Sequence, residues 1–322
     1  MATETESDAD TASATSDPDD RALGDEDGPI LGERRREEFR AAAGQVFENP
    51  LAKVGAVLLA VFLLMALFGP MAAPYSPDAH QTNPDGSWYK NQGPSADHPL
   101  GTNSQGQDLF SRLLHGARIA FVTGLATALI VGVFGTIAGI TAGYYGGHVE
   151  TLIMRLVDLA YGVPFLPFAI VLIIVLDPSI WNIIIAISAI LWRETARVVR
   201  SEVITIKDLE MIDAARSAGA SDNRILLHHI LPKVLPTTVL YSVFAIGWAI
   251  LTEAGLSFLG LGDPETISWG RMLQAAYVSQ ALDRELWWWI IPPGLCIAGL
   301  VASVYFISQG VEEVVNPKLR DR

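Results

Sequence analysis

Apolar residues along the chain gather into six long runs that are separated by polar stretches. The runs cover about 54–72, 119–142, 152–176, 180–192, 237–259 and 287–308. Most approach the roughly 20 residues that a helix needs to cross a bilayer. The fourth run is short, so its assignment depends on a turn at Asp177-Pro178, and we expect its helix to continue through Val199. The pattern predicts an all-α membrane protein with six transmembrane helices.

Glycine and proline mark special positions inside two of these runs. Gly135, Gly139 and Gly143 recur at every fourth position of the second run. Small residues at this spacing let helix backbones approach closely in lipid. Pro164 and Pro167 interrupt the third run, and a membrane helix tolerates such a break where its neighbours satisfy the freed carbonyl groups. We expect a closely packed second helix and a kinked third helix.

The polar segment from Glu202 to Pro236 has the pattern of two short amphipathic helices joined by a tight turn. The first helix carries Ile206, Leu209, Met211, Ile212 and Ala215 at near-helical spacing, and the second carries Ile225, Leu226, His229 and Ile230. Gly219 can take the positive φ that ends a helix. Ser221 can cap the second helix, with Asp222 favourable in its first turn. We expect Pro232 to stop that helix.

The positions of lysine and arginine predict the orientation in the membrane. With six spans, three basic groups fall on one side: Arg34, Arg35, Arg36, Arg40 and Lys53; Arg193, Arg197, Arg200, Lys207, Arg216, Arg224 and Lys233; and Lys318, Arg320 and Arg322. The 73–118 and 260–286 loops are poorer in basic residues. Both termini and the 202–236 segment are therefore predicted to be cytoplasmic. There the segment favours a docking surface for a soluble partner, and the alternative is a helix lying on the lipid surface.

Acidic residues concentrate in the first 29 positions, which hold ten carboxylates and one arginine. The chain has a net charge of −13, so only −4 remains for residues 30–322. With almost no large apolar residue, this tail cannot bury enough surface to order itself. A solvated acidic extension suits a salt-rich cytoplasm, such as that of a halophilic archaeon.

The sequence contains no pattern that predicts catalysis or a metal site. It lacks Gly-x4-Gly-Lys-Ser/Thr, so it has no phosphate-binding loop of that kind. Its six histidines show no metal-protease spacing, and Cys296 is the only cysteine, which excludes an intramolecular disulfide.

Charged residues in or beside the apolar runs are the remaining candidates. Glu253 lies inside the fifth run, so it is either part of a translocation path or a structural hydrogen-bond acceptor near the outer end. Arg155 and Asp158 could pair on one helix face. Arg193 and Glu194 could form an ion pair where the fourth run ends.

The 202–236 segment resembles the signature loop of ABC-importer permeases. That loop begins Glu-Ala-Ala, places a glycine four residues after the second alanine, and ends in Leu-Pro. Here Asp213 replaces the glutamate and keeps its charge, and the other landmarks match. These landmarks are Ala214-Ala215, Gly219 and Leu231-Pro232. Segments outside the loop resemble the dipeptide/oligopeptide/nickel branch of the family: His98-Pro99-Leu100-Gly101-Thr102, Gly106-x-Asp108, Ser111-Arg112 and Ser268-Trp269-Gly270. The resemblance covers about residues 48–322.

The resemblance implies a fold, a mechanism and partners. The fold would be the core of a type I ABC importer, arranged like a methionine permease, with one extra N-terminal span. The loop would dock on a cytoplasmic ABC ATPase subunit that binds the ATP, so this chain would hold no cofactor, metal or catalytic residue. A second permease subunit would complete a heterodimer, and an extracellular solute-binding protein would deliver the cargo. The implied ATPase-coupling residues are Asp213, Ala214, Ala215, Gly219, Ser221, Asp222, Leu231 and Pro232.

The implied cargo is dipeptides or oligopeptides, with nickel or oligosaccharides as alternatives within the family. Two other classes stay open. An ion-gradient-driven secondary transporter would need buried acidic residues in several spans and an inverted repeat. A membrane scaffold or receptor without transport would need neither.

The expected organisation follows from these runs and segments. It comprises a disordered acidic cytoplasmic tail (1–33), a juxtamembrane segment with the first span (34–72), an extracellular loop (73–118), a permease core with five spans (119–311) that includes the coupling loop 200–236, and a cytoplasmic C-terminal tail (312–322).

Overall fold

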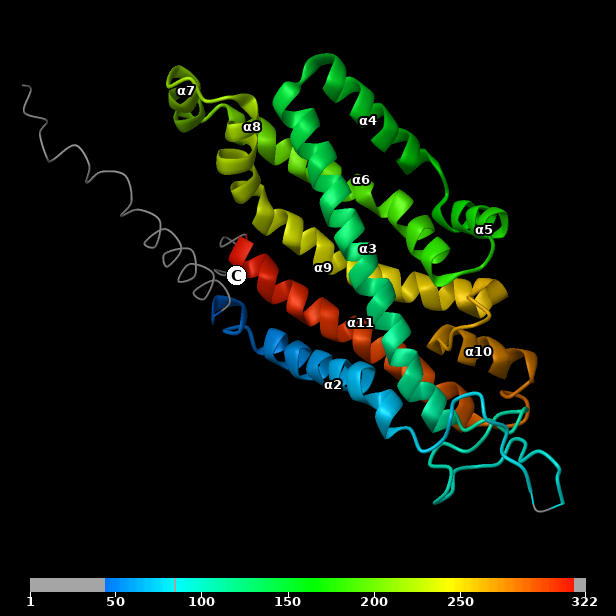
Figure 1. Ribbon diagram of the computed structural model, residues 1–322. Coiled ribbons are helices and arrows are strands. Elements are labelled where there is room, and N and C mark those ends of the chain that lie inside the picture. Colours follow the sequence, from blue (N-terminus) through cyan, green and yellow to red (C-terminus); the bar gives the residue numbers. More distant parts are fainter. Residues whose placement is uncertain (1–43, 84, 316–322) are drawn as a thin grey trace, which may run out of the picture. The chain divides into compact units, whose positions relative to one another are not determined.

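The computed structural model describes residues 44–83 and 85–315, which are mostly helical (Figure 1). The chain divides into two units after Gln45, and all the helices below belong to the second unit. The expected acidic tail and residues 316–322 lie outside the described residues. The helices are α2 (Pro50–Ala72), α3 (Leu109–Tyr145), α4 (Gly147–Gly162), α5 (Phe165–Leu176), α6 (Ile180–Lys207), α7 (Glu210–Ser217), α8 (Asp222–Ile225), η2 (Leu226–Ile230), α9 (Leu231–Leu256), η3 (Ser257–Leu261), α10 (Trp269–Val278) and α11 (Trp287–Val315).

The long helix α3 organises the bundle. It has 37 residues, which corresponds to roughly 55 Å at 1.5 Å per residue. It packs against α6, α9 and α2, and Figure 1 shows it crossing the other helices from the α2–α3 loop to the end that carries α7 and α8. Asp108 starts the helix, because its carboxylate accepts a hydrogen bond from the amide of Ser111 at 2.7 Å. The two ends of α3 therefore mark two separate regions of the protein.

The predicted close packing of the glycine-rich helix is confirmed, and its partner is α6. A β-carbon added at Gly135 would lie 2.5 Å from the β-carbon of Thr195. At Gly139 it would lie 2.7 Å from the carbonyl oxygen of Ala196, and at Gly143 it would lie 2.7 Å from the β-carbon of Val203. Atoms cannot approach this closely, so the backbones of α3 and α6 meet only because these side chains are absent.

The all-α membrane class is supported, but the expected count of six spans is not confirmed. Within the described residues, four helical stretches are long and apolar enough to cross a membrane: α2, α3, Asp222–Leu261 and α11. The pair α4–α5 qualifies as a fifth if its two bent parts count as one span. α6 is helical beyond Val199 as expected, but its second half carries several charged residues, such as Glu194, Arg197 and Arg200.

The predicted break in the third run is confirmed, and it is sharper than a simple kink. α4 ends at Gly162, α5 begins at Phe165, and the two helices meet at 95°. Pro164 lies at the break, and Pro167 falls in the first turn of α5, where a missing amide hydrogen removes no helical bond.

Two expected ion pairs do not form among the described residues. Asp158 of α4 pairs with Arg197 of α6 at 2.7 Å, and not with Arg155 on its own helix. Arg193 donates to the carbonyl of Ala160 and stacks 4.3 Å above the ring of Tyr161, and it does not pair with Glu194. Contacts between helices take precedence in both cases, because α4 and α6 pack side by side.

The expectation that Pro232 stops its helix is wrong. The helix passes Pro232 without a break, because α8 continues through η2 into α9, and backbone angles first leave the helical range at Gly260 (φ +87°). The π-helical turn η2 precedes the proline, and the amide of Leu231 donates to the carbonyl of Leu226, five residues earlier. This wider register, together with the place of Pro232 in the first turn of α9, accommodates the missing amide hydrogen.

The α3–α6 contact predicts the effect of a single methyl group. Gly139→Ala should destabilise the protein by about 1–3 kcal/mol, because the new β-carbon overlaps backbone and side-chain atoms of α6. Gly294→Ala in α11 is the matched control, because no atom lies within 4 Å of a β-carbon there. Thermal unfolding in detergent measures both variants. Equal stability of the two would contradict the role of this contact.

Candidate functional site

The polar segment folds as α7, a tight turn and α8, as its pattern predicts, and α8 continues through η2 into α9. We call residues 209–232 the elbow. Gly219 has φ +81°, a conformation that other L-residues rarely adopt. Its amide donates to the carbonyl of Arg216 at 2.9 Å, and the amide of Ala220 donates to the carbonyl of Ala215 at 3.0 Å. These two bonds form a Schellman motif, so Gly219 ends α7 in the predicted way.

The elbow rests on its own small hydrophobic core. Ile212 of α7, Ile225 of α8 and Ile230 of η2 are fully buried. They pack with Val199 and Val203 of α6, and the same cluster includes Ile140 and Tyr144 of α3, Ile206 of α6 and Val234 of α9. Burial of an isoleucine side chain stabilises by about 1.5–3 kcal/mol. Three such side chains hold the elbow firmly against the ends of α3, α6 and α9.

Polar contacts made by α3 and α6 fix the orientation of the elbow on this core. The hydroxyl group of Tyr144 donates to the carboxylate of Asp222 at 2.7 Å. The guanidinium of Arg216 lies 5.6 Å above the ring of Tyr144. The Nζ of Lys207 donates to the carbonyl of Gly143 at 3.0 Å. The last turn of α3 is thus bound to both halves of the elbow.

The face of the elbow that points away from this core is exposed and partly apolar. Asp213 and Ala214 are exposed, whereas Ala215 is partly buried against the core. Leu209 and Met211 have 40% and 41% of their surface exposed, although both are apolar. Asp213 pairs with Arg216 at 3.4 Å, and both side chains are well exposed to solvent, so this ion pair adds little stability. The exposed face thus includes the carboxylate of Asp213, the very small side chain of Ala214 and the large apolar side chains of Leu209 and Met211.

Ser221 and the Leu231-Pro232 pair differ in part from what was expected. Ser221 occupies the residue before α8 with extended backbone angles, but its side chain makes no capping hydrogen bond. Asp222 lies in the first turn, as predicted, and Tyr144 is its partner. Leu231 is partly buried in the elbow core and Pro232 is exposed at the start of α9. This continuous helix joins the elbow to α9 without a flexible connection.

Glu253 lies far from the elbow, near the other end of α9. Its side chain is buried, with 4% of its surface exposed, and it accepts a hydrogen bond from the hydroxyl group of Ser257 at 2.6 Å. This geometry matches the structural-acceptor alternative, while a role in a translocation path stays a prediction. Among the described residues, no group of three or more His, Cys, Asp or Glu side chains could hold a metal ion.

Sequence reasoning did not identify Tyr144 or Lys207 as parts of the site. Tyr144 contacts a residue 78 positions away, and Lys207 contacts one 64 positions away. Only the packing of α3 against α6 brings them to the elbow. The tyrosine pair Tyr144-Tyr145 at the end of an apolar run was the one available signal, because such residues collect at helix ends near the membrane surface.

Two family models and several curated proteins match the chain. Residues 135–321 match "Binding-protein-dependent transport system inner membrane component", and residues 39–94 match "N-terminal TM domain of oligopeptide transport permease C". The dipeptide transport system permease protein DppC of Alkalihalophilus pseudofirmus is 35% identical over 283 residues, 88% of this chain and 90% of that protein. The oligopeptide transport system permease protein OppC of Bacillus subtilis is 36% identical over 84% of this chain and 87% of that protein. These matches do not test the expected halophilic archaeal source, which stays a prediction.

The positive φ of Gly219 generates a prediction about the elbow itself. No atom lies within 4 Å of a β-carbon at this position, so glycine is required for its backbone conformation and not for lack of space. Gly219→Val should cost about 1–2 kcal/mol in the left-handed conformation and should raise amide hydrogen exchange in the elbow about 5- to 30-fold. Gly219→Asn should have a smaller effect, because asparagine tolerates this region better. Exchange mass spectrometry of the detergent-solubilised protein measures both, and unchanged exchange in Gly219→Val would contradict the motif's role.

Proposed function

The chain belongs to the family of binding-protein-dependent transport system inner membrane components, and we propose that it is the membrane-spanning permease subunit of an ATP-driven peptide importer. The observation that carries the proposal is the elbow, which is held firmly to the helix bundle on one side and exposed on the other. A docked partner that moves this segment must also move α3, α6 and α9. The cargo assignment rests on relatives that are named as dipeptide and oligopeptide permeases.

In this proposal the elbow is a coupling helix that docks on a cytoplasmic ABC ATPase subunit. Ala214 has no side chain beyond its β-carbon, so α7 can lie close to a groove on the partner. Asp213 supplies one negative charge, while Leu209 and Met211 supply solvent-exposed apolar surface that the partner would cover. Gly219 fixes the angle between α7 and α8, and Ser221 and Asp222 lie on the exposed side of the turn. ATP is bound by the partner subunit, and this chain has no enzymatic role of its own.

Movement of the elbow would reach the membrane through stiff helices. The helix is continuous from α8 through η2 and α9, and α9 alone has 26 residues, or roughly 39 Å. Tyr144 binds the same turn to the end of α3. Closure of an ATPase pair would pull the elbow and tilt α9 and α3 together, which changes access from one side of the membrane to the other. Leu231-Pro232 transmits the movement because the pair forms the first turn of α9 and follows η2 directly.

For the membrane arrangement we propose six spans in the order of a type I importer, with the core similar to that of a methionine permease. The bent pair α4–α5 would be the third span and α6 the fourth. Both termini and the elbow would be cytoplasmic, as the distribution of lysine and arginine indicates. The segment boundaries proposed from the sequence, 34–72, 73–118, 119–311 and 312–322, are kept. The partners would be a second permease subunit, giving a heterodimer, and an extracellular solute-binding protein that delivers the cargo.

Alternatives within and outside the family make different predictions. Nickel or oligosaccharide permeases share the fold, so only uptake measurements separate them from a peptide permease. A secondary transporter would need buried carboxylates in several spans. Among the described residues, the buried acidic side chains are Asp108, which caps α3, and Glu253. Glu253 alone lies inside an apolar helix, which favours the ATP-driven mechanism and makes Glu253 the candidate for the translocation path. ATP-dependent peptide uptake in vesicles, insensitive to ionophores, tests the proposal against this class.

Ala214→Trp tests the docking surface directly. The indole ring should prevent close approach of the ATPase subunit and weaken its binding at least about tenfold, which corresponds to 1.4 kcal/mol. The change should leave folding and membrane insertion intact, because Ala214 is exposed. His148→Trp is the matched control, since His148 is exposed near the same end of the bundle but outside the elbow. Co-purification of the ATPase subunit measures both variants, and full recovery with Ala214→Trp would argue against docking at α7.

A further inference from the structure

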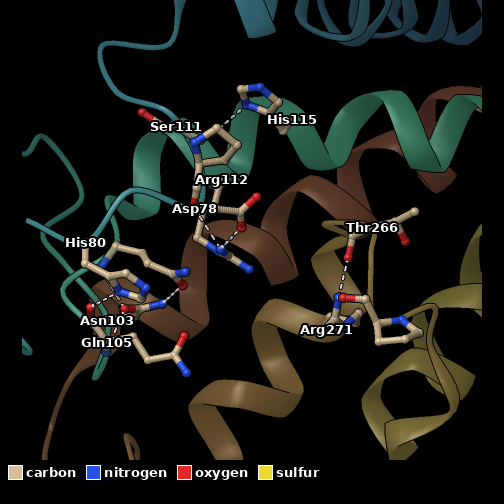
Figure 2. Close-up of polar contacts among 12 residues, drawn as sticks. Asp78, His80, Asn103, Gln105, Ser111, Arg112, His115, Thr266 and Arg271 are labelled. Carbon is tan, nitrogen blue, oxygen red and sulfur yellow. Dashed lines mark hydrogen bonds and ion pairs between the residues drawn. The ribbon is translucent and has the colours of Figure 1, made fainter.

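A polar cavity lies at the end of α3 that is opposite to the elbow. Its volume is about 360 Å³, close to the lower limit for small-ligand pockets. It is formed where the α2–α3 loop meets the first turn of α3, helix α10 and the start of α11. The lining residues are Asn103, Ser104, Gln105, Gln107, Arg112, Arg271, Met272, Gln274, Ala275, Val278, Ser279 and Trp289. Figure 2 shows several of them, with Arg112 reaching from α3 and Arg271 from α10.

The charge of this cavity is positive and unbalanced. Its lining contains the two guanidinium groups of Arg112 and Arg271 and no carboxylate. The two positive charges repel each other across the cavity. Asp78 lies 3.3 Å from Arg112, but its side chain is 76% exposed while that of Arg112 is 14% exposed. A pair whose acidic partner is so well hydrated neutralises the buried cation only weakly.

Each guanidinium uses only one of its nitrogen atoms for the protein. The Nη1 of Arg271 donates to the carbonyls of Asp263 at 2.9 Å and Pro264 at 2.8 Å, and to that of Thr266. The Nη1 of Arg112 donates to the carbonyl of Pro77 at 2.9 Å and to Asp78. Within the described residues, the Nε and Nη2 atoms of both arginines have no hydrogen-bond partner. These two atoms form the planar fork that binds a carboxylate with two hydrogen bonds.

Neutral side chains complete the wall, and hydrogen bonds hold Asn103 and Gln107 in place. Asn103 accepts hydrogen bonds from the amides of Gln105 and Gln107, each at 2.9 Å, and donates to the side-chain oxygen of Gln107 at 2.7 Å. The amide nitrogen of the Gln107 side chain is left to donate elsewhere. Gln274 also lines the cavity and makes no hydrogen bond within the described part of the chain. The cavity thus offers donors on a rigid frame.

We propose that this cavity binds the terminal carboxylate of a peptide through the free forks of Arg112 and Arg271. The proposal rests on the peptide-import function above, since it assigns one chemical group of the cargo to one site of the permease. The recess favours a slender chain end over a broad protein surface, because the Arg112 side chain is only 14% exposed. The unpaired amide groups of Gln107 and Gln274 suit the neighbouring peptide bond.

The test compares a peptide acid with its amide on the assembled importer in nanodiscs of zwitterionic lipid. Labelled trialanine and trialanine amide are the probes, and equilibrium binding is measured without ATP. Gln274→Glu places a carboxylate in the cavity at constant size and should weaken binding of the acid about tenfold or more, with little change for the amide. Arg271→Lys keeps the charge but removes the fork, and should also weaken binding of the acid. Gln92→Glu, an exposed glutamine of the same loop that does not line the cavity, should change neither.

Several results would overturn the assignment. Equal effects of Gln274→Glu on acid and amide, equal effects of Gln92→Glu and Gln274→Glu, or no measurable binding of the acid would each do so. If Gln274→Glu abolished binding of the external solute-binding protein to the importer while peptide binding stayed unchanged, the cavity would be assigned to an acidic side chain of that protein instead. ATP-dependent uptake by the same complex reconstituted into sealed vesicles separates the two proposals. Uptake without acid discrimination refutes only the cavity, and acid discrimination without ATP-dependent uptake refutes only the proposed function.

Discussion

The contact between α3 and α6 is the constraint on which the rest of the structure depends. Three glycines on α3 allow the two backbones to touch at Thr195, Ala196 and Val203. A bilayer supplies no hydrophobic force between helices, so such close packing must stabilise the pair. The elbow needs this pair as its base, because its core includes Val199 and Val203 from α6 and Tyr144 from α3. A separation of α3 and α6 would remove that base.

Packing, and not ion pairing, binds the elbow to the bundle. Three fully buried isoleucines contribute about 1.5–3 kcal/mol each, whereas an exposed pair such as Asp213–Arg216 contributes about 0–1 kcal/mol. The polar contacts of Tyr144 and Lys207 fix orientation more than they add stability. This division suits a coupling segment, because the side that faces the bundle is rigid while the opposite side keeps an exposed carboxylate and exposed apolar surface. The partner can then bind without first breaking contacts of the elbow.

The sequence predicted the elements that depend on local spacing. The two elbow helices, the turn at Gly219, the glycine contact and the break at Pro164 are confirmed, since each follows from residues that are close in the chain. The prediction for Pro232 was wrong because the π-helical turn before it widens the hydrogen-bond register, which composition does not reveal. The pairing of Asp158 with Arg197 and the tie of Tyr144 to Asp222 join residues 39 and 78 positions apart, so they depend on how the helices pack. The arginine cavity could not be predicted from the sequence for the same reason, because Arg112 and Arg271 come from different helices.

The two ends of the molecule are connected through the same helices. Tyr144 ties the elbow to the last turn of α3, and Arg112 lies in the first turns of that helix. Arg271 belongs to α10, and a β-carbon at its neighbour Gly270 would lie 2.4 Å from the carbonyl of Ala254, so α10 is packed tightly on the end of α9. Arg112 would therefore move with α3, and Arg271 would move with α9. Under the proposed mechanism, a pull on the elbow that tilts α9 against α3 would change the separation of the two guanidinium groups. A carboxylate held between them would stabilise one tilt over the other, which is the differential affinity that a ligand needs to shift a conformational equilibrium.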